Sequence, residues 1–203
     1  MIQYYYGKCF KIEAKKIITE YLNKIITMYK TGLTIVVMLF PLFSLAQTNI
    51  NELDPEQYFD FWVGEWEVSW EEGEGDMGSG TNIVEKTLDG SVIQENFRIL
   101  EGNNKGFKGT SISVYQPRFD RWKQSWADNT GGYFDFTGKI DGNKRIFQTE
   151  VVEMEDGRKL IQRMVFYDIT DNSMTWDWEA SEDGGDTWTL NWRINYIRKI
   201  IDH

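Results

Sequence analysis

The chain has 203 residues, a formal net charge of −10 and 15% aromatic residues, with one cysteine (Cys9) and one histidine (His203). This length is enough for one domain, or at most two, with a buried core. A single cysteine excludes an intramolecular disulfide. A single, terminal histidine excludes a Ser-His-Asp or Cys-His catalytic site, an HExxH zinc site and a His-ligated haem pocket. We therefore predict no metal ion, no cofactor and no catalytic residues of these kinds.

The N-terminal region differs in composition from the rest of the chain. Residues 33–45 form an apolar run of 13 that follows Lys30, and its end overlaps Ser44-Leu45-Ala46, a small-x-small cleavage pattern. This layout predicts a signal peptide over residues 28–46, with translation starting at Met28 or Met1. Residues 1–27 are then a spurious or extended N-terminus. An N-terminal amphipathic helix and an uncleaved membrane anchor are the alternatives.

The predicted mature part, residues 47–203, is strongly acidic. Residues 1–46 hold six Lys and two Glu, which leaves 16 Lys and Arg against 30 Asp and Glu, a net charge of −14. A surface of this sign repels phosphate backbones and anionic lipids. We expect an exported protein, periplasmic or secreted after cleavage near Ala46, with no nucleic-acid partner and no stable membrane span. Its oligomeric state stays open.

The mature part reads as ten strands separated by nine turns. Turn signals rich in Asp, Asn and Gly recur at short intervals, because these residues tolerate the left-handed backbone of tight hairpins. Between the turns, apolar and polar residues alternate with a period of two. The clearest alternating segments are 62–70, 173–180 and 187–196. A short helix over 55–61 is expected before the first strand, because Asp54 suits an N-cap and Pro55 the first helical position.

Ten hairpin-linked strands need a way to hide their edges. An open sheet would leave unpaired backbone groups at both edges and an exposed face rich in tryptophan. Closure into an antiparallel up-and-down barrel removes both problems. We therefore predict an all-β fold with a barrel of about ten strands, and a two-sheet sandwich is the alternative.

Several segments carry a family resemblance. Residues 61–66, Phe-Trp-Val-Gly-Glu-Trp, follow the short helix and resemble the opening of lipocalin-like (calycin) barrels. Together with residues 109–115, 122–128 and 166–169, they make the chain similar to the DUF1579 family of exported bacterial proteins over roughly residues 58–198. The resemblance implies a lipocalin-like barrel and no agreed biochemical activity.

A second motif lies before the last strand. Residues 181–188, Ser-Glu-Asp-Gly-Gly-Asp-Thr-Trp, fit the Asp-box pattern of sialidase propellers. In physical terms it is a hairpin: the Asp carboxylate accepts turn amides, glycine supplies a positive φ, and the tryptophan packs under the turn. Because the motif occurs once here, we interpret it as a structural hairpin and not as a sign of glycosidase activity.

Candidate site residues are polar or aromatic side chains that the alternation directs toward the barrel interior. Glu95 shares a face with Phe97, and Gln124 lies between two tryptophans. A buried carboxyl needs a partner, for which Arg163 is a candidate, although its strand is apolar on both faces. We predict that the ligand-binding residues are Glu95, Phe97, Gln124, Trp126, Arg163, Trp176 and Trp178.

Three classes of function are compatible with these features. The first is a binding module that holds a small apolar or amphipathic molecule inside the barrel. The second is an enzyme that uses Glu95 or Glu150 as a general base. The third is a module that binds glycans or the cell envelope. We favour the first, because no nucleophile–base pair, metal cluster or phosphate-binding glycine loop supports an enzyme.

Overall fold

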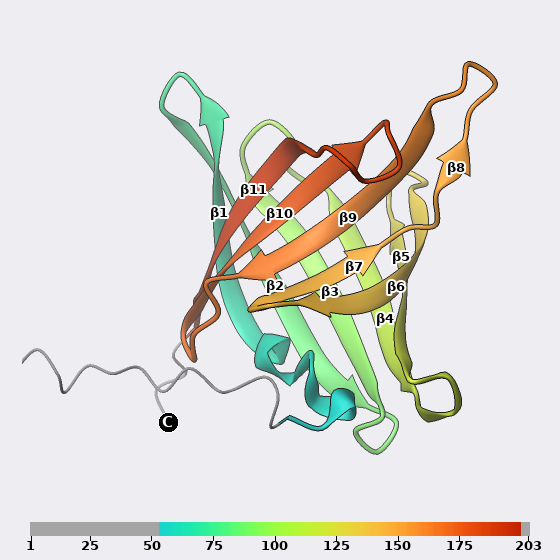
Figure 1. Cartoon of the computed structure of the whole chain (residues 1–203). Coiled ribbons are helices and arrows are strands. Elements are labelled where there is room, and N and C mark those ends of the chain that lie inside the picture. The colour runs from blue at the N-terminus through green and yellow to red at the C-terminus, as the bar shows by residue number, and fades with distance from the viewer. Residues whose placement is uncertain (1–52, 200–203) are drawn as a thin grey trace, which may run out of the picture. The chain divides into compact units, whose positions relative to one another are not determined.

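The computed structural model describes residues 53–199, which form a closed antiparallel β-barrel preceded by a short helical segment (Figure 1). The strands are β1 (Gly64–Gly73), β2 (Asp76–Thr87), β3 (Val92–Glu101), β4 (Lys108–Gln116), β5 (Arg121–Asp128), β6 (Tyr133–Asp141), β7 (Lys144–Gln148), β8 (Val152–Glu153), β9 (Lys159–Tyr167), β10 (Ser173–Ser181) and β11 (Thr189–Arg198). The predicted signal peptide (28–46) and the extension 1–27 lie outside the described residues.

Ten strands close the ring. Each of β1 to β7 pairs with the next, β7 pairs with β9, β9 with β10, β10 with β11, and β11 returns to β1. The remaining strand, β8, has two residues and pairs with β9 outside the ring. The predicted barrel of about ten strands is thus confirmed, and the alternative of two open sheets is wrong. Among residues 53–199, no helix is long and apolar enough to cross a membrane.

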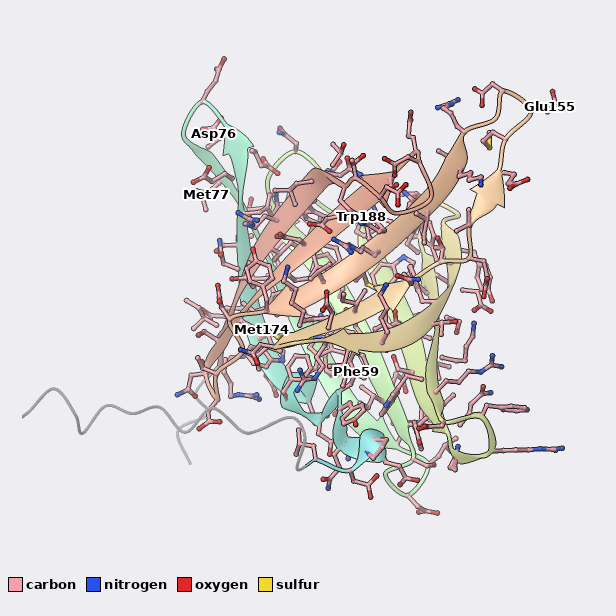
Figure 2. The ribbon with its side chains drawn as sticks, in the orientation of Figure 1. Phe59, Asp76, Met77, Glu155, Met174 and Trp188 are labelled. Atoms are coloured by element: carbon pink, nitrogen blue, oxygen red, sulfur yellow. The ribbon has the colours of Figure 1, made fainter. Side chains whose placement is uncertain are left out.

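The helical segment closes one end of the barrel. It consists of two 3-10 turns, η3 (Pro55–Gln57) and η4 (Asp60–Trp62), where the sequence predicted one short helix. Asp54 caps η3 by accepting a hydrogen bond from the backbone of Glu56 at 3.0 Å. Phe59, between the turns, is fully buried (Figure 2). Its ring stacks on Phe147 with centroids 4.2 Å apart.

Two arginines attach this segment to the barrel wall. The Arg145 Nε donates to the carbonyl of Tyr58 at 2.9 Å. The Arg198 guanidinium donates to the carbonyls of Val63 at 2.8 Å and Phe61 at 3.1 Å. It also lies 4.1 Å above the ring centre of Trp66. Hydrogen bonds from charged donors are stronger than neutral ones, so these contacts hold the segment in the barrel mouth.

Gly64 makes room for the Arg198 contact. A Cβ placed on Gly64 would lie 2.0 Å from the Arg198 Nη1, and the φ of +144° is one that side chains rarely adopt. We expect Gly64→Ala to lower the free energy of unfolding by about 1–3 kcal/mol, measured by urea denaturation. Gly157→Ala is the control, because Gly157 also has a positive φ (+85°) but nothing lies within 4 Å of its Cβ position. Equal losses in both variants would mean that the arginine contact contributes nothing.

Residues 181–188 form the hairpin between β10 and β11, as predicted. The Asp183 carboxylate accepts hydrogen bonds from Ser181 and Thr187, which hold its pKa far below the usual range. The Trp188 Nε1 donates to the carbonyl of Gly185 at 3.0 Å. The motif therefore stabilises a turn, in agreement with the structural interpretation.

Candidate functional site

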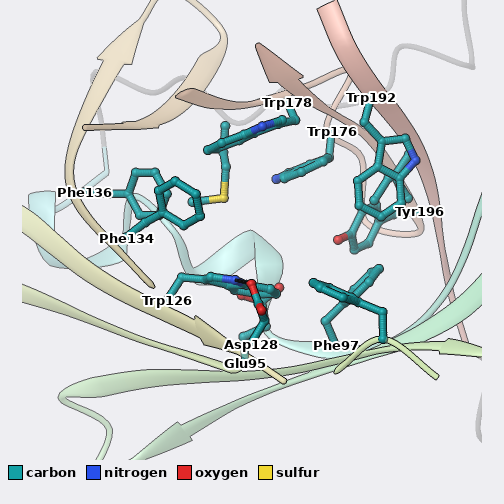
Figure 3. A pocket seen from close by; sticks show the side chains of 13 residues that line it. Glu95, Phe97, Trp126, Asp128, Phe134, Phe136, Trp176, Trp178, Trp192 and Tyr196 are labelled. Atoms are coloured by element: carbon teal, nitrogen blue, oxygen red, sulfur yellow. Dashed lines mark hydrogen bonds between the residues drawn. The ribbon is translucent and has the colours of Figure 1, made fainter. Parts of the chain in front are cut away.

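A cavity lies between side chains of β3, β5, β6, β9, β10 and β11 (Figure 3). Its volume is about 160 Å³ and it is partly open to solvent. Nine of its thirteen lining residues are aromatic, two more are apolar, and the remaining two are carboxylates. The lining consists of Glu95, Phe97, Phe107, Trp126, Asp128, Phe134, Phe136, Met164, Trp176, Trp178, Trp192, Ile194 and Tyr196.

Tryptophan rings form one wall of the cavity. The rings of Trp176 and Trp178, both on β10, are nearly parallel, with centroids 6.4 Å apart. Trp192 on β11 stands edge-on to Trp176 at 5.9 Å, and Phe134 on β6 stands edge-on to Trp178 at 5.5 Å. Contacts of this kind favour a fixed ring geometry. The wall is therefore a preformed aromatic surface.

Glu95 lies at the inner end of the cavity, where a layer of polar side chains crosses the barrel. Its Oε1 accepts a hydrogen bond from Asn82 Nδ2 at 2.7 Å, and its Oε2 accepts one from Ser111 Oγ at 2.6 Å. The same Asn82 amide donates to the Tyr196 hydroxyl at 3.2 Å. Gln124 Nε2 donates to Ser111 Oγ at 3.3 Å. These side chains come from β2, β3, β4, β5 and β11.

Burial decides the protonation of this layer. Glu95 is only 4% exposed, and loss of hydration raises its pKa from 4.5 to about 7, although the bonds from Ser111 and Asn82 act in the opposite direction. Burial and the nearby Glu95 carboxyl raise the pKa of Tyr196 above its usual range. Glu95 therefore changes charge near neutral pH while Tyr196 stays neutral.

The polar layer holds more acceptors than donors. The side-chain oxygens of Asn82 (Oδ1) and Gln124 (Oε1) are buried and have no hydrogen-bond partner within residues 53–199. Each oxygen of Glu95 takes one hydrogen bond from a side chain and can accept another. A buried acceptor without a partner costs about 1–3 kcal/mol. A donor placed here would be favourable.

Asp128 marks the outer end of the cavity, at the last residue of β5. Burial pushes its pKa upward, but hydrogen bonds from Thr130, Gly132 and Trp126 outweigh burial and lower it. The Trp126 indole donates to Asp128 Oδ2 at 3.2 Å. A second carboxylate thus faces the same cavity, and it is the more readily ionised of the two.

The structure brings most of the predicted site residues together. Five of them line the cavity, namely Glu95, Phe97, Trp126, Trp176 and Trp178. Gln124 is buried beside Glu95 in the polar layer and supports Ser111 without lining the cavity. Glu150 lies exposed between β7 and β8 and is not a lining residue.

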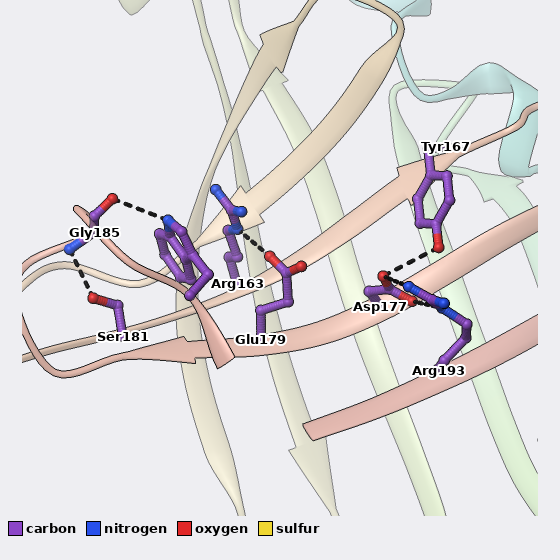
Figure 4. A network of polar contacts seen from close by, with 8 residues as sticks. Arg163, Tyr167, Asp177, Glu179, Ser181, Gly185 and Arg193 are labelled. Carbon is purple, nitrogen blue, oxygen red and sulfur yellow. Dashed lines mark hydrogen bonds and ion pairs between the residues drawn. The ribbon is translucent and has the colours of Figure 1, made fainter. Parts of the chain in front are cut away.

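The sequence suggested Arg163 as a partner for Glu95, but Arg163 lies on the outer face of β9 and does not contact Glu95 (Figure 4). Its Nε donates to Glu179 at 2.6 Å, and its guanidinium lies 3.6 Å above the ring centre of Trp188. A neighbouring outer pair joins Arg193 to Asp177 by two hydrogen bonds of 2.8 Å. These pairs cross-link β9, β10 and β11 outside the barrel. Arg163 therefore belongs to the wall and not to the cavity.

Sequence reasoning missed two polar contributors. Asn82 sits on a β2 face of small and apolar residues, Gly78, Gly80 and Val84, and that pattern marks an interior position. Asp128 begins the turn signal Asp-Asn-Thr-Gly-Gly over residues 128–132, which predicts only a turn residue at this position. Its position two residues after Trp126 on the same face could have identified it.

No protein-family model matches the chain, and a search of curated proteins finds no similar sequence. The site must therefore be interpreted from its own chemistry. Among the described residues, no group of three or more His, Cys, Asp or Glu side chains is placed to hold a metal ion.

Proposed function

We propose that the barrel is a binding module for a small, largely apolar molecule, held in the aromatic cavity. The observation that supports this most is the cavity of about 160 Å³ with nine aromatic lining residues and a partly open end. Pockets of this composition are typical ligand sites, since apolar walls provide affinity and a few polar groups provide orientation. Glu95 and Asp128 are those polar groups.

From the resemblance of residues 61–66 to the opening of lipocalin-like barrels, we also propose that the chain is related to the DUF1579 and lipocalin-like group. We likewise propose that the protein is exported after cleavage near Ala46. An intact-mass measurement on protein from the native host would then give a chain that starts at Gln47.

Titration with toluene tests the binding proposal. We expect a saturable change in tryptophan fluorescence, because four of the lining residues are tryptophans. Trp176→Ala should weaken toluene binding about tenfold by calorimetry, since an aromatic contact contributes about 0.5–1.5 kcal/mol beyond its buried area.

Trp188→Ala is the matched control, because Trp188 packs on the outer wall against Arg163. The affinity of the Trp188→Ala variant for toluene should equal that of the unmodified protein. If toluene, indole and phenol all fail to give saturable binding, the proposal is wrong.

A further inference from the structure

The cavity has the charge pattern of a site for a cation. Its lining includes two carboxylates, Glu95 and Asp128, and no Lys, Arg or His. Arg163 and Arg198 in the barrel wall have other partners, since Arg163 pairs with Glu179 and Arg198 binds backbone carbonyls. An anion that entered would meet negative charge without compensation, whereas a cation would be attracted.

The hydrogen-bonding capacity points in the same direction. Glu95 belongs to the polar layer and lines the cavity, and each of its two carboxylate oxygens can accept one more hydrogen bond, which leaves an excess of acceptors at this end. A primary ammonium offers three donors and no acceptor, so it complements this excess. A carboxylate or phosphate ligand carries acceptors only and would add to the excess of acceptors.

The aromatic wall favours positive charge as well. A cation over the face of a tryptophan gains about 2 kcal/mol when both are shielded from water. Trp176 and Trp178 on β10, with Trp192 on β11, lie across the cavity from Glu95 (Figure 3). Such rings also hold the apolar part of a ligand.

The volume limits the size of the ligand. An apolar cavity of about 150 Å³ in another protein binds benzene. The cavity here, at about 160 Å³, accommodates one ring, and a short substituent can extend toward Glu95 or toward the open end.

From these observations we infer that the cavity selects an organic cation: a single aromatic or apolar ring that carries a protonated amine directed at the Glu95 carboxylate. This inference rests on the proposed function and specifies its ligand class. In the complex, the ammonium would donate to Glu95 while the ring lies against the tryptophan wall.

Three probes of nearly equal shape test the inference on the full chain by calorimetry: benzylamine (cation), benzyl alcohol (neutral) and benzoate (anion). Glu95 is ionised mainly above pH 7, while benzylamine stays protonated throughout. Benzylamine binding should therefore tighten about tenfold between about pH 6 and about pH 8. The titratable lining residues besides Glu95 are Asp128 and Tyr196, and neither changes charge in this range.

The variant Glu95→Gln keeps the shape of the side chain and removes its charge. We expect it to lose the preference for benzylamine over benzyl alcohol and the pH dependence, while benzyl alcohol still binds. Glu67→Gln, at an exposed position of β1, is the control and should retain both. If Glu95→Gln does not fold, the comparison of the three probes on the unmodified protein decides the question by itself.

The outcomes separate the two proposals. Equal binding of benzyl alcohol and benzylamine at about pH 8, or preference for benzoate, would overturn the cation inference and leave the binding module standing. Failure of all three probes and of toluene would overturn both.

Discussion

Replacing Phe59 with alanine is expected to lower the free energy of unfolding by about 4 kcal/mol, which removes much of the stability of a domain this size. The side chain is fully buried. It stacks on Phe147 at 4.2 Å and meets the edge of Trp122 at 5.1 Å. Because the surrounding rings belong to different strands of a closed barrel, they cannot collapse into the space that the phenyl ring leaves.

Urea denaturation measures this loss, and Phe119→Ala is the matched control. Phe119 lies at the same end of the barrel, in η5 (Pro117–Phe119), but is 57% exposed. Its replacement should change the free energy of unfolding by less than about 1 kcal/mol. A similarly small loss for Phe59→Ala would show that the helical segment does not seal the barrel.

The stability of the protein is expected to fall as the pH rises through neutrality, because Glu95 must ionise inside the barrel. Burial raises the pKa of Glu95 from 4.5 to about 7, so the folded state binds its proton more tightly than the unfolded state. The favourable contribution is complete below pH 4.5 and is lost as the pH rises through about 7. The loss amounts to about 3 kcal/mol.

Other carboxyls act in the opposite direction at lower pH. Hydrogen bonds lower the pKa values of Asp128 and Asp183, so their contribution to stability is lost as the pH falls. The difference in unfolding free energy between the unmodified protein and Glu95→Gln removes these effects. We expect Glu95→Gln to gain stability relative to the unmodified protein from about pH 5 to about pH 8, by urea denaturation at each pH. A difference that is independent of pH would show that Glu95 is not desolvated.

The sequence was sufficient to predict the barrel and the direction of its clearest strands. Trp66 and Trp70 on β1, like Trp176 and Trp178 on β10, point inward as their alternation indicates. Glu95 could be assigned to the interior for the same reason, since its face is otherwise apolar. Alternation predicts side-chain direction reliably wherever one face of a strand is exposed to solvent and the other is buried.

The orientation of other side chains depends on structural features that the alternation of a single segment does not predict. Arg163 could not be oriented, because β9 buries Ile161 and Val165 outside the barrel as well as Phe166 inside. Strict alternation over residues 187–196 predicts that Trp188 shares a face with Trp192. A register shift after Trp178 breaks this alternation and places Trp188 on the outer wall. Bulges and covered outer faces arise from pairing with neighbouring strands, which a single segment does not reveal.

Binding inside the barrel can be observed most directly at Met164, whose side chain lines the cavity and is 5% exposed. With ¹³C-labelled methionine methyl groups, the Met164 resonance can be assigned through Met164→Leu and followed during titration with benzylamine. We expect a saturable shift of the Met164 methyl, caused by the ring of the probe, and no shift of Met77, which is 53% exposed on β2. A stationary Met164 signal at saturating benzylamine and toluene, or shifts confined to Met77, would contradict ligand binding in the cavity.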